Sequence, residues 1–126
     1  MGAEMDISFY QSQTYPNPPC WNMVADVYTR ELSKGVQDFR TVTDSVRDIA
    51  RAFSIALRKS NNGFMQIGEP VNMCIVLMGK NQKNGVHHCG VYLDGHVLHA
   101  LREGVLYQDM ASLKDVYERI EFWSKA

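Results

Sequence analysis

The amino-acid sequence predicts one α+β domain, in which N-terminal helices pack on a small, mostly antiparallel β-sheet formed by the second half of the chain. Before residue 60, apolar residues recur at intervals of three and four, which is typical of amphipathic helices. After residue 70 they alternate or form short runs between turn residues, which is typical of strands. A chain of 126 residues, 45% of them hydrophobic, is long enough to bury one core, so residues 1–126 are expected to form a single domain.

Two helices are expected in the first half. Residues 1–19 end in a proline-rich stretch and are expected to be irregular, because proline fixes φ and removes an amide donor. The helix that follows ends near Gly35. Its apolar stripe consists of Trp21, Val24, Ala25, Tyr28 and Leu32. A second helix is predicted over residues 45–59, with Asp44 as its N-cap.

The second half is expected to be rich in strands. Residues 73–78 form an apolar run that predicts a strand, and residues 88–100 read as a β-hairpin. Further strands are predicted over 105–108 and 120–123. Between these two, residues 112–115 resemble a capping box that opens a short helix.

The hairpin places two histidines on one face of the sheet. Asp-Gly at positions 94 and 95 favours a type I′ turn, because both central residues of that turn need positive φ. In a two-residue loop, His88 and His99 become diagonal neighbours with Cβ atoms roughly 7 Å apart or less. Gly90 leaves the space between their rings empty. The register places Cys89 on the opposite, apolar face.

The three cysteines do not form a disulfide framework, because their number is odd and their spacing irregular. Cys20 stands where the first helix begins, and unpaired amides and the helix dipole at that end favour the thiolate. The same amides suit a developing oxyanion. Cys74 and Cys89 are expected to pack in the core as small hydrophobic residues. Cys20 is therefore the candidate nucleophile.

Composition and charge exclude several classes of function. A net charge of -1 provides no basic surface for nucleic acid or for an anionic membrane. The longest apolar run, over residues 71–78, is too short for membrane insertion. No secretory signal is evident, so synthesis in the cytoplasm is expected. A zinc site would draw on His87, Cys89, His96 and His99, but Cys89 and His99 face opposite sides of the sheet, so no metal is expected.

Several segments, in the same order along the chain, resemble NlpC-like cell-wall cysteine peptidases, which are papain-like. Residues 20–24 (CWNMV) and 27–32 (VYTREL) resemble the nucleophile helix of this family, most closely in its bacteriophage tail-protein branch. Residues 70–78 (PVNMCIVLM) look like the first core strand of the family. Residues 88–93 (HCGVYL) and 97–100 (VLHA) look like the strands that carry the catalytic histidine and the third polar residue.

The resemblance implies a Cys-His-His triad. Cys20 would be the nucleophile, His88 the general base and His99 the residue that holds the His88 ring in the right tautomer. The family places a tyrosine near the oxyanion, and either Tyr10 or Tyr15 could fill that role. Trp21, beside the nucleophile, is a further candidate for the oxyanion or for substrate contact, although a core position is its simplest explanation. No cofactor is implied.

The implied activity is hydrolysis of peptide bonds in the stem peptides of bacterial peptidoglycan, commonly between γ-D-glutamate and a diamino acid. The implied setting is the virion, where a phage tail component with other tail proteins as partners would aid cell-wall penetration. The chain departs from the family pattern at Pro19 and Asn22, where Asp and Gly are usual, and at residues 72–73, where Gly-Asp is common. The departures at Pro19 and Asn22 leave open the alternative of a non-catalytic structural or assembly protein of the tail tip. A further alternative is a papain-like hydrolase that acts on a protein or another amide.

Overall fold

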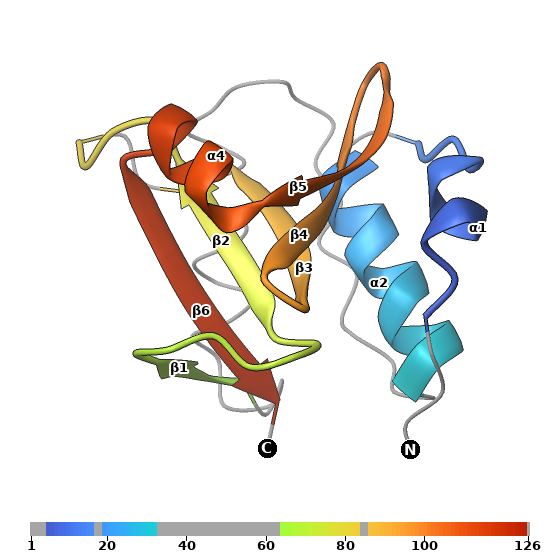
Figure 1. Ribbon diagram of the computed structural model, residues 1–126, viewed down its shortest axis with the longest axis horizontal. Helices are drawn as coiled ribbons and strands as arrows, with labels where there is room; N and C mark the ends of the chain where they lie inside the picture. The colour runs from blue at the N-terminus through green and yellow to red at the C-terminus, as the bar shows by residue number, and fades with distance from the viewer. Residues whose placement is uncertain (1–4, 17–18, 33–63, 84–85, 126) are drawn as a thin grey trace.

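The computed structural model describes residues 5–16, 19–32, 64–83 and 86–125, and Figure 1 shows their arrangement. A six-stranded sheet lies at the centre, in the order β1-β6-β2-β3-β4-β5, and every pair of neighbouring strands is antiparallel. The strands are β1 Phe64–Ile67, β2 Ile75–Gly79, β3 His88–Leu93, β4 His96–Leu101, β5 Gly104–Asp109 and β6 Arg119–Lys125. The helices are α1 Ile7–Gln11, α2 Pro19–Leu32 and α4 Met110–Val116. The α+β class expected from the sequence is confirmed.

The N-terminal segment is more ordered than its composition predicts. Residues 1–19 were expected to be irregular, but α1 forms within them because the Asp6 carboxylate accepts a hydrogen bond from the Phe9 N–H at 3.2 Å. The predicted first helix is α2, and Trp21, Val24 and Tyr28 of its apolar stripe are buried as expected. Ala25 and Leu32 of the same stripe are only partly buried. The predicted helix over residues 45–59 lies outside the described residues.

The predicted strands are present, with small changes in their bounds. Residues 73–78 correspond to β2, residues 105–108 to β5 and residues 120–123 to β6. The sequence did not predict β1, a short edge strand that pairs only with β6. The short helix predicted from residues 112–115 is present as α4, but the predicted capping box is wrong, because the helix begins earlier. Its N-cap is Asp109, whose carboxylate accepts from the Ser112 N–H at 3.0 Å.

The histidine hairpin forms in the predicted register. Asp94 and Gly95 have φ values of 53° and 82°, the left-handed conformations that a type I′ turn requires. Leu93 pairs with His96, and Val91 pairs with Leu98. The turn is therefore a two-residue loop, and the predicted division of side chains between the two faces follows from it.

The turn of this hairpin is tied to the start of β2. The Asp94 N–H donates to the Asn72 side chain at 2.9 Å, and the Asn72 amide donates back to the Asp94 carboxylate at 3.2 Å. Met73 has a φ of 73°, and its N–H donates to the Tyr92 carbonyl at 2.7 Å. The Tyr28 hydroxyl of α2 donates to the Met73 carbonyl. Asn72 and Met73 thus connect β2, the hairpin and α2.

Each face of the sheet has its own hydrophobic cluster. On one face, α1 and α2 pack over inward side chains of the central strands, including Ile75, Cys89 and Leu98. On the other face, Leu113 of α4 packs on Val76, Met78 and Val97. Figure 1 shows the helices on these two sides, α1 and α2 in blue and α4 in red. The β3–β4 hairpin lies between the two layers and carries both histidines.

Candidate active site

The two histidines of the hairpin form a buried hydrogen-bonded pair. His88 is 7% exposed and His99 is 1% exposed, and His88 Nε2 lies 2.8 Å from His99 Nδ1. Their ring centroids are 4.9 Å apart, with the ring planes nearly perpendicular. Gly90 permits this approach, because a Cβ at that position would lie 3.0 Å from the His99 Cβ. The predicted juxtaposition of His88 and His99 is therefore present.

A glutamine extends the pair, and the sequence analysis did not single it out. His99 Nε2 lies 2.7 Å from Oε1 of Gln108, which comes from β5. Burial and the neighbouring His88 charge lower the pKa of His99 to about 4, while the contact with Gln108 raises it. His99 is therefore neutral at pH 7. The signal that could have revealed Gln108 is a two-residue turn between Leu101 and Gly104. That turn sets the β4–β5 register in which Gln108 is opposite Val97 and therefore diagonal to His99.

Cys20 approaches this histidine pair from the first turn of α2. Its side chain is 5% exposed. The pKa of the Cys20 thiol lies well below its usual range, first because of a hydrogen bond with the Cys89 side chain and then because of the hydrogen bond and charge of His88. Burial opposes this shift. The helix dipole at this end of α2 also favours the thiolate.

The other two thiols have surroundings that favour the protonated form. Burial and the neighbouring Cys20 raise the pKa of Cys89, which is fully buried. Burial also raises the pKa of Cys74, at the entry to β2. Cys89 packs in the core as predicted, but no local sequence pattern indicated its interaction with Cys20. Cys20 is the one of the three thiols whose pKa responds to His88, so it is the thiol suited to nucleophilic attack.

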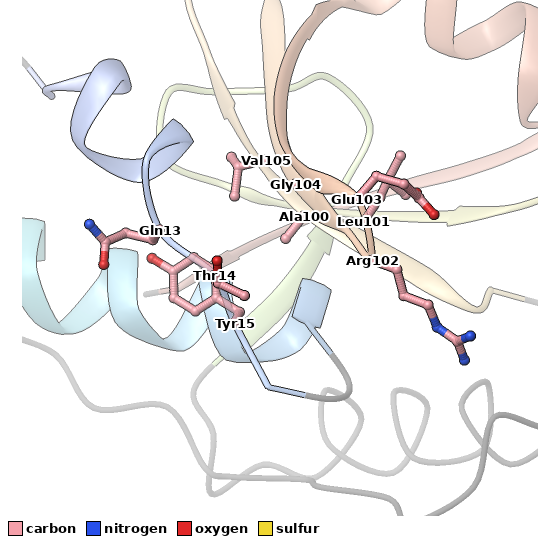
Figure 2. A pocket seen from close by; sticks show the side chains of 9 residues that line it. All are labelled: Gln13, Thr14, Tyr15, Ala100, Leu101, Arg102, Glu103, Gly104 and Val105. Carbon is pink, nitrogen blue, oxygen red and sulfur yellow. The ribbon is translucent and has the colours of Figure 1, made fainter.

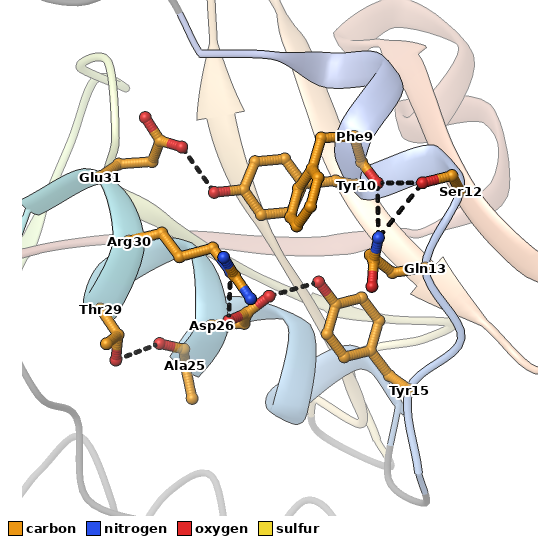
Figure 3. A network of polar contacts seen from close by, with 10 residues as sticks. All are labelled: Phe9, Tyr10, Ser12, Gln13, Tyr15, Ala25, Asp26, Thr29, Arg30 and Glu31. Carbon is orange, nitrogen blue, oxygen red and sulfur yellow. Dashed lines mark hydrogen bonds and ion pairs between the residues drawn. The ribbon is translucent and has the colours of Figure 1, made fainter.

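The two tyrosines considered for the oxyanion bind carboxylates of α2 instead. The Tyr10 hydroxyl donates to Glu31 at 2.6 Å, and the Tyr15 hydroxyl donates to Asp26 at 2.7 Å. Figure 3 shows both contacts, together with the Arg30–Asp26 ion pair. At 1.5 Å per residue, Asp26 and Glu31 lie about 9 and 16 Å along the helix from Cys20. The structure therefore does not bring either hydroxyl to the thiol.

The residues that flank Cys20 have structural roles. Pro19 is the first residue of α2, a position that suits proline because the N–H there has no partner in the helix. The Asn22 amide donates to the Pro16 carbonyl at 2.9 Å, which ties the preceding segment to the helix. Trp21 is 1% exposed and belongs to the core on the α2 side of the sheet. Both departures from the family pattern are thus accommodated locally.

Tyr117 is a second residue near the site that the sequence analysis did not single out. Its ring lies nearly parallel to that of His88, with centroids 5.8 Å apart, and is 9% exposed. It follows directly after α4, and its N–H donates to the Leu113 carbonyl. Because the start of α4 was predicted too late, the sequence analysis could not predict that the Tyr117 ring lies beside His88. Tyr117 covers His88 on the side of the sheet that carries α4.

A small pocket lies between the segment before α2 and the β4–β5 turn. Gln13, Thr14 and Tyr15 line one side, and residues 100–105 line the other. Figure 2 shows Tyr15, Ala100 and Val105 at this pocket, and of these Ala100 and Val105 are buried. Ala100 follows His99 directly, and Tyr15 lies five positions before Cys20 in the sequence. The pocket is thus formed by segments adjoining the candidate nucleophile and triad histidine.

Among the described residues, no group of three or more His, Cys, Asp or Glu side chains is arranged to hold a metal ion. In the same part of the chain, no helix is both long and apolar enough to cross a membrane. No protein-family model matches the chain, and no curated protein is significantly similar to it. The site consists of a buried thiol, two imidazoles and a side-chain amide, each interacting with the next.

Proposed function

We propose that the protein is a cysteine hydrolase of the papain-like NlpC type, with Cys20 as nucleophile, His88 as general base and His99 as the residue that orients His88. One observation carries this proposal. The His88 imidazole, which lies 2.8 Å from a second buried imidazole, also interacts through a hydrogen bond and its charge with the Cys20 thiol at the start of α2. A thiol activated by a base that a third group orients is the arrangement that nucleophilic catalysis needs.

The geometry supports a specific division of roles for the two nitrogens of His88. Nε2 faces His99, which leaves Nδ1 to exchange a proton with Cys20. In the proposed reaction the Cys20 sulfur attacks the scissile carbonyl carbon, and the oxyanion forms near the N-terminus of α2. His88 then gives its proton to the leaving amine as the C–N bond breaks. Water, deprotonated by His88, hydrolyses the thioester and restores the thiol.

The proposed substrates are stem peptides of bacterial peptidoglycan, cleaved between γ-D-glutamate and a diamino acid. This part of the proposal rests on the ordered sequence resemblance to NlpC-like peptidases rather than on the site geometry. The proposed setting is a phage tail that opens the cell wall during entry. The alternative is a structural protein of the tail tip, and the low exposure of Cys20, at 5%, favours that alternative.

The test measures release of muropeptides from purified sacculi. Wild type, Cys20→Ala, His88→Ala and Cys74→Ala are incubated with Gram-negative and Gram-positive sacculi, and the products are identified by mass spectrometry. Cys74→Ala is the matched control, because it removes a buried thiol outside the candidate site. Circular dichroism checks that each variant is folded.

We expect wild type and Cys74→Ala to release the same peptides, while Cys20→Ala and His88→Ala release none. Wild type that releases nothing from either wall would favour the structural alternative or a different amide substrate. A panel of peptide and amide substrates then separates these two. Activity that persists in Cys20→Ala would overturn the assignment of the nucleophile.

A further inference from the structure

We infer that Gln108 is a positioning residue that fixes the tautomers of both histidines. It thereby keeps Nδ1 of neutral His88, the nitrogen left for Cys20, without a proton. This inference deepens the proposed function and rests on it. Gln108 does not contact the thiol. It acts through His99, and its effect reaches Cys20 through two hydrogen bonds.

The first step is the contact between Gln108 and His99. The Gln108 atom facing His99 is Oε1, which can only accept a hydrogen bond. At a separation of 2.7 Å, His99 Nε2 must therefore carry a proton. Because the low pKa of His99 keeps the ring neutral at pH 7, its other nitrogen, Nδ1, is an acceptor.

The second step passes this constraint to His88. The Nδ1 acceptor of His99 lies 2.8 Å from His88 Nε2, so His88 must donate from Nε2. When His88 is neutral, its Nδ1 then carries no proton and can accept one from Cys20. The opposite tautomer of His99 would place a proton on Nδ1 and force His88 Nε2 to accept. The proton of His88 would then lie on Nδ1, and the base would be blocked.

The fold holds Gln108 rigidly enough for this role. Gln108 pairs with Val97 in the β4–β5 ladder, which places its side chain on the same face as His99. The next residue, Asp109, is the N-cap of α4 and bonds both the N–H and the hydroxyl of Ser112. The glutamine is thus fixed between a paired strand and a capped helix.

Several titratable groups face this chain of hydrogen bonds, and each must be counted when pH is varied. Cys20 of α2 and Cys89 of β3 lie on the thiol side. His87 precedes β3 and interacts with both His88 and Cys20. Tyr117, after α4, interacts with Cys20 and stacks on His88. Gln108 itself does not titrate, so its removal leaves this set of charges unchanged.

The first experiment observes the tautomers directly and needs no hydrolysis. Two-dimensional 15N–1H NMR of the imidazoles, in the Cys20→Ser background at pH 7, identifies the protonated nitrogen of each ring. The background variant and its Gln66→Leu derivative should show His99 protonated at Nε2. Gln66, an exposed glutamine of β1, is the matched control. In Gln108→Leu, we expect a substantial population of His99 protonated at Nδ1. Unchanged tautomers in that variant would overturn the inference.

The second experiment measures the rate at which iodoacetamide alkylates Cys20 between pH 5 and 9, with sites identified by mass spectrometry. Gln108→Leu should lower the rate at pH 6.5 at least tenfold, whereas Gln66→Leu should leave it unchanged. Gln108→Glu still accepts from His99 and should restore the rate at neutral pH. Its negative charge raises the pKa of His99, so the acid limb of the profile should move to higher pH.

The two experiments separate failure of the inference from failure of the proposed function. Wild-type Cys20 that reacts no faster than Cys74 at pH 6 would contradict the activated thiol, while the NMR result on Gln108 would still stand. A normal wild-type profile that Gln108→Leu leaves unchanged would overturn the role of Gln108 and leave the Cys-His pair intact. If circular dichroism shows that Gln108→Leu does not fold, Gln108→Glu provides the test instead. An acid limb of its alkylation profile that does not move to higher pH would then overturn the inference.

Discussion

Replacement of Gly90 by alanine tests whether the histidine pair depends on close contact between β3 and β4. A Cβ at this position would lie 2.6 Å from the Leu98 carbonyl oxygen and 2.6 Å from Val97 Cγ1. An ordinary contact between carbon and oxygen is about 3.3 Å or more, so the strands must separate by about 0.7 Å. The Leu98 oxygen belongs to the backbone of a paired strand and cannot rotate away.

Overpacking of this kind destabilises a fold by about 1–3 kcal/mol. For a domain of this size the expected fall in Tm is about 4–12 °C. The control is Gly68→Ala, because Gly68 has no neighbour within 4 Å of its would-be Cβ and no positive φ. There the loss of chain entropy in the unfolded state should leave Tm equal or slightly higher. Thermal unfolding followed by circular dichroism measures both variants.

Gly90→Ala should also slow alkylation of Cys20 at pH 6.5, because separation of the strands lengthens the 2.8 Å contact between His88 and His99. A Tm within 1 °C of the Gly68→Ala value would refute the steric reasoning. A large fall in Tm with unchanged alkylation would instead refute the link between strand spacing and the thiol.

Three other outcomes follow from the same contacts. The pKa of His99 falls from 6.5 to about 4 on folding, mainly through burial. Between these two pH values acid protonates the unfolded chain before the folded one, so the free energy of unfolding falls by about 3 kcal/mol by pH 4. His99→Asn should flatten the dependence of the unfolding free energy on pH over that range. Cys89→Ala removes the largest influence that lowers the pKa of Cys20, so the midpoint of the alkylation profile should move to higher pH, and an unchanged midpoint would contradict that contact. Tyr10→Phe removes the hydrogen bond to Glu31 and should lower the unfolding free energy by about 1 kcal/mol in urea titration without changing alkylation of Cys20; slower alkylation would place Tyr10 in the site after all.

The parts of the site that local chemistry determines could be predicted from the sequence. The Asp-Gly turn fixes the register of β3 and β4, and that register alone brings His88 and His99 together. The start of α2 could likewise be placed near Cys20, since an apolar stripe with helical spacing follows a proline-rich segment. In both cases the signal lies within a few residues of the feature it predicts.

The parts that depend on contacts between distant segments could not be predicted. The sequence resemblance offers either Tyr10 or Tyr15 for the oxyanion, but both hydroxyls donate to carboxylates of α2. The contact between Cys20 and Cys89 depends on how α2 packs against β3, which no local pattern specifies. Gln108 depends on the register of a second hairpin whose turn lacks the Asn-Gly or Asp-Gly signal.

The position of β6 has a consequence for how the molecule folds. β6 lies between β1 and β2, so Phe64 finds its partner Lys125 only across 61 positions of the sequence, whereas β2, β3 and β4 each pair with the next strand along the chain. Pairing between sequence neighbours closes short loops and is fast, whereas pairing across long separations is slow. The four strands that contain both histidines can therefore assemble before β6 inserts beside them. Pulsed hydrogen exchange during refolding should show amides of β3 and β4 protected earlier than those of β1.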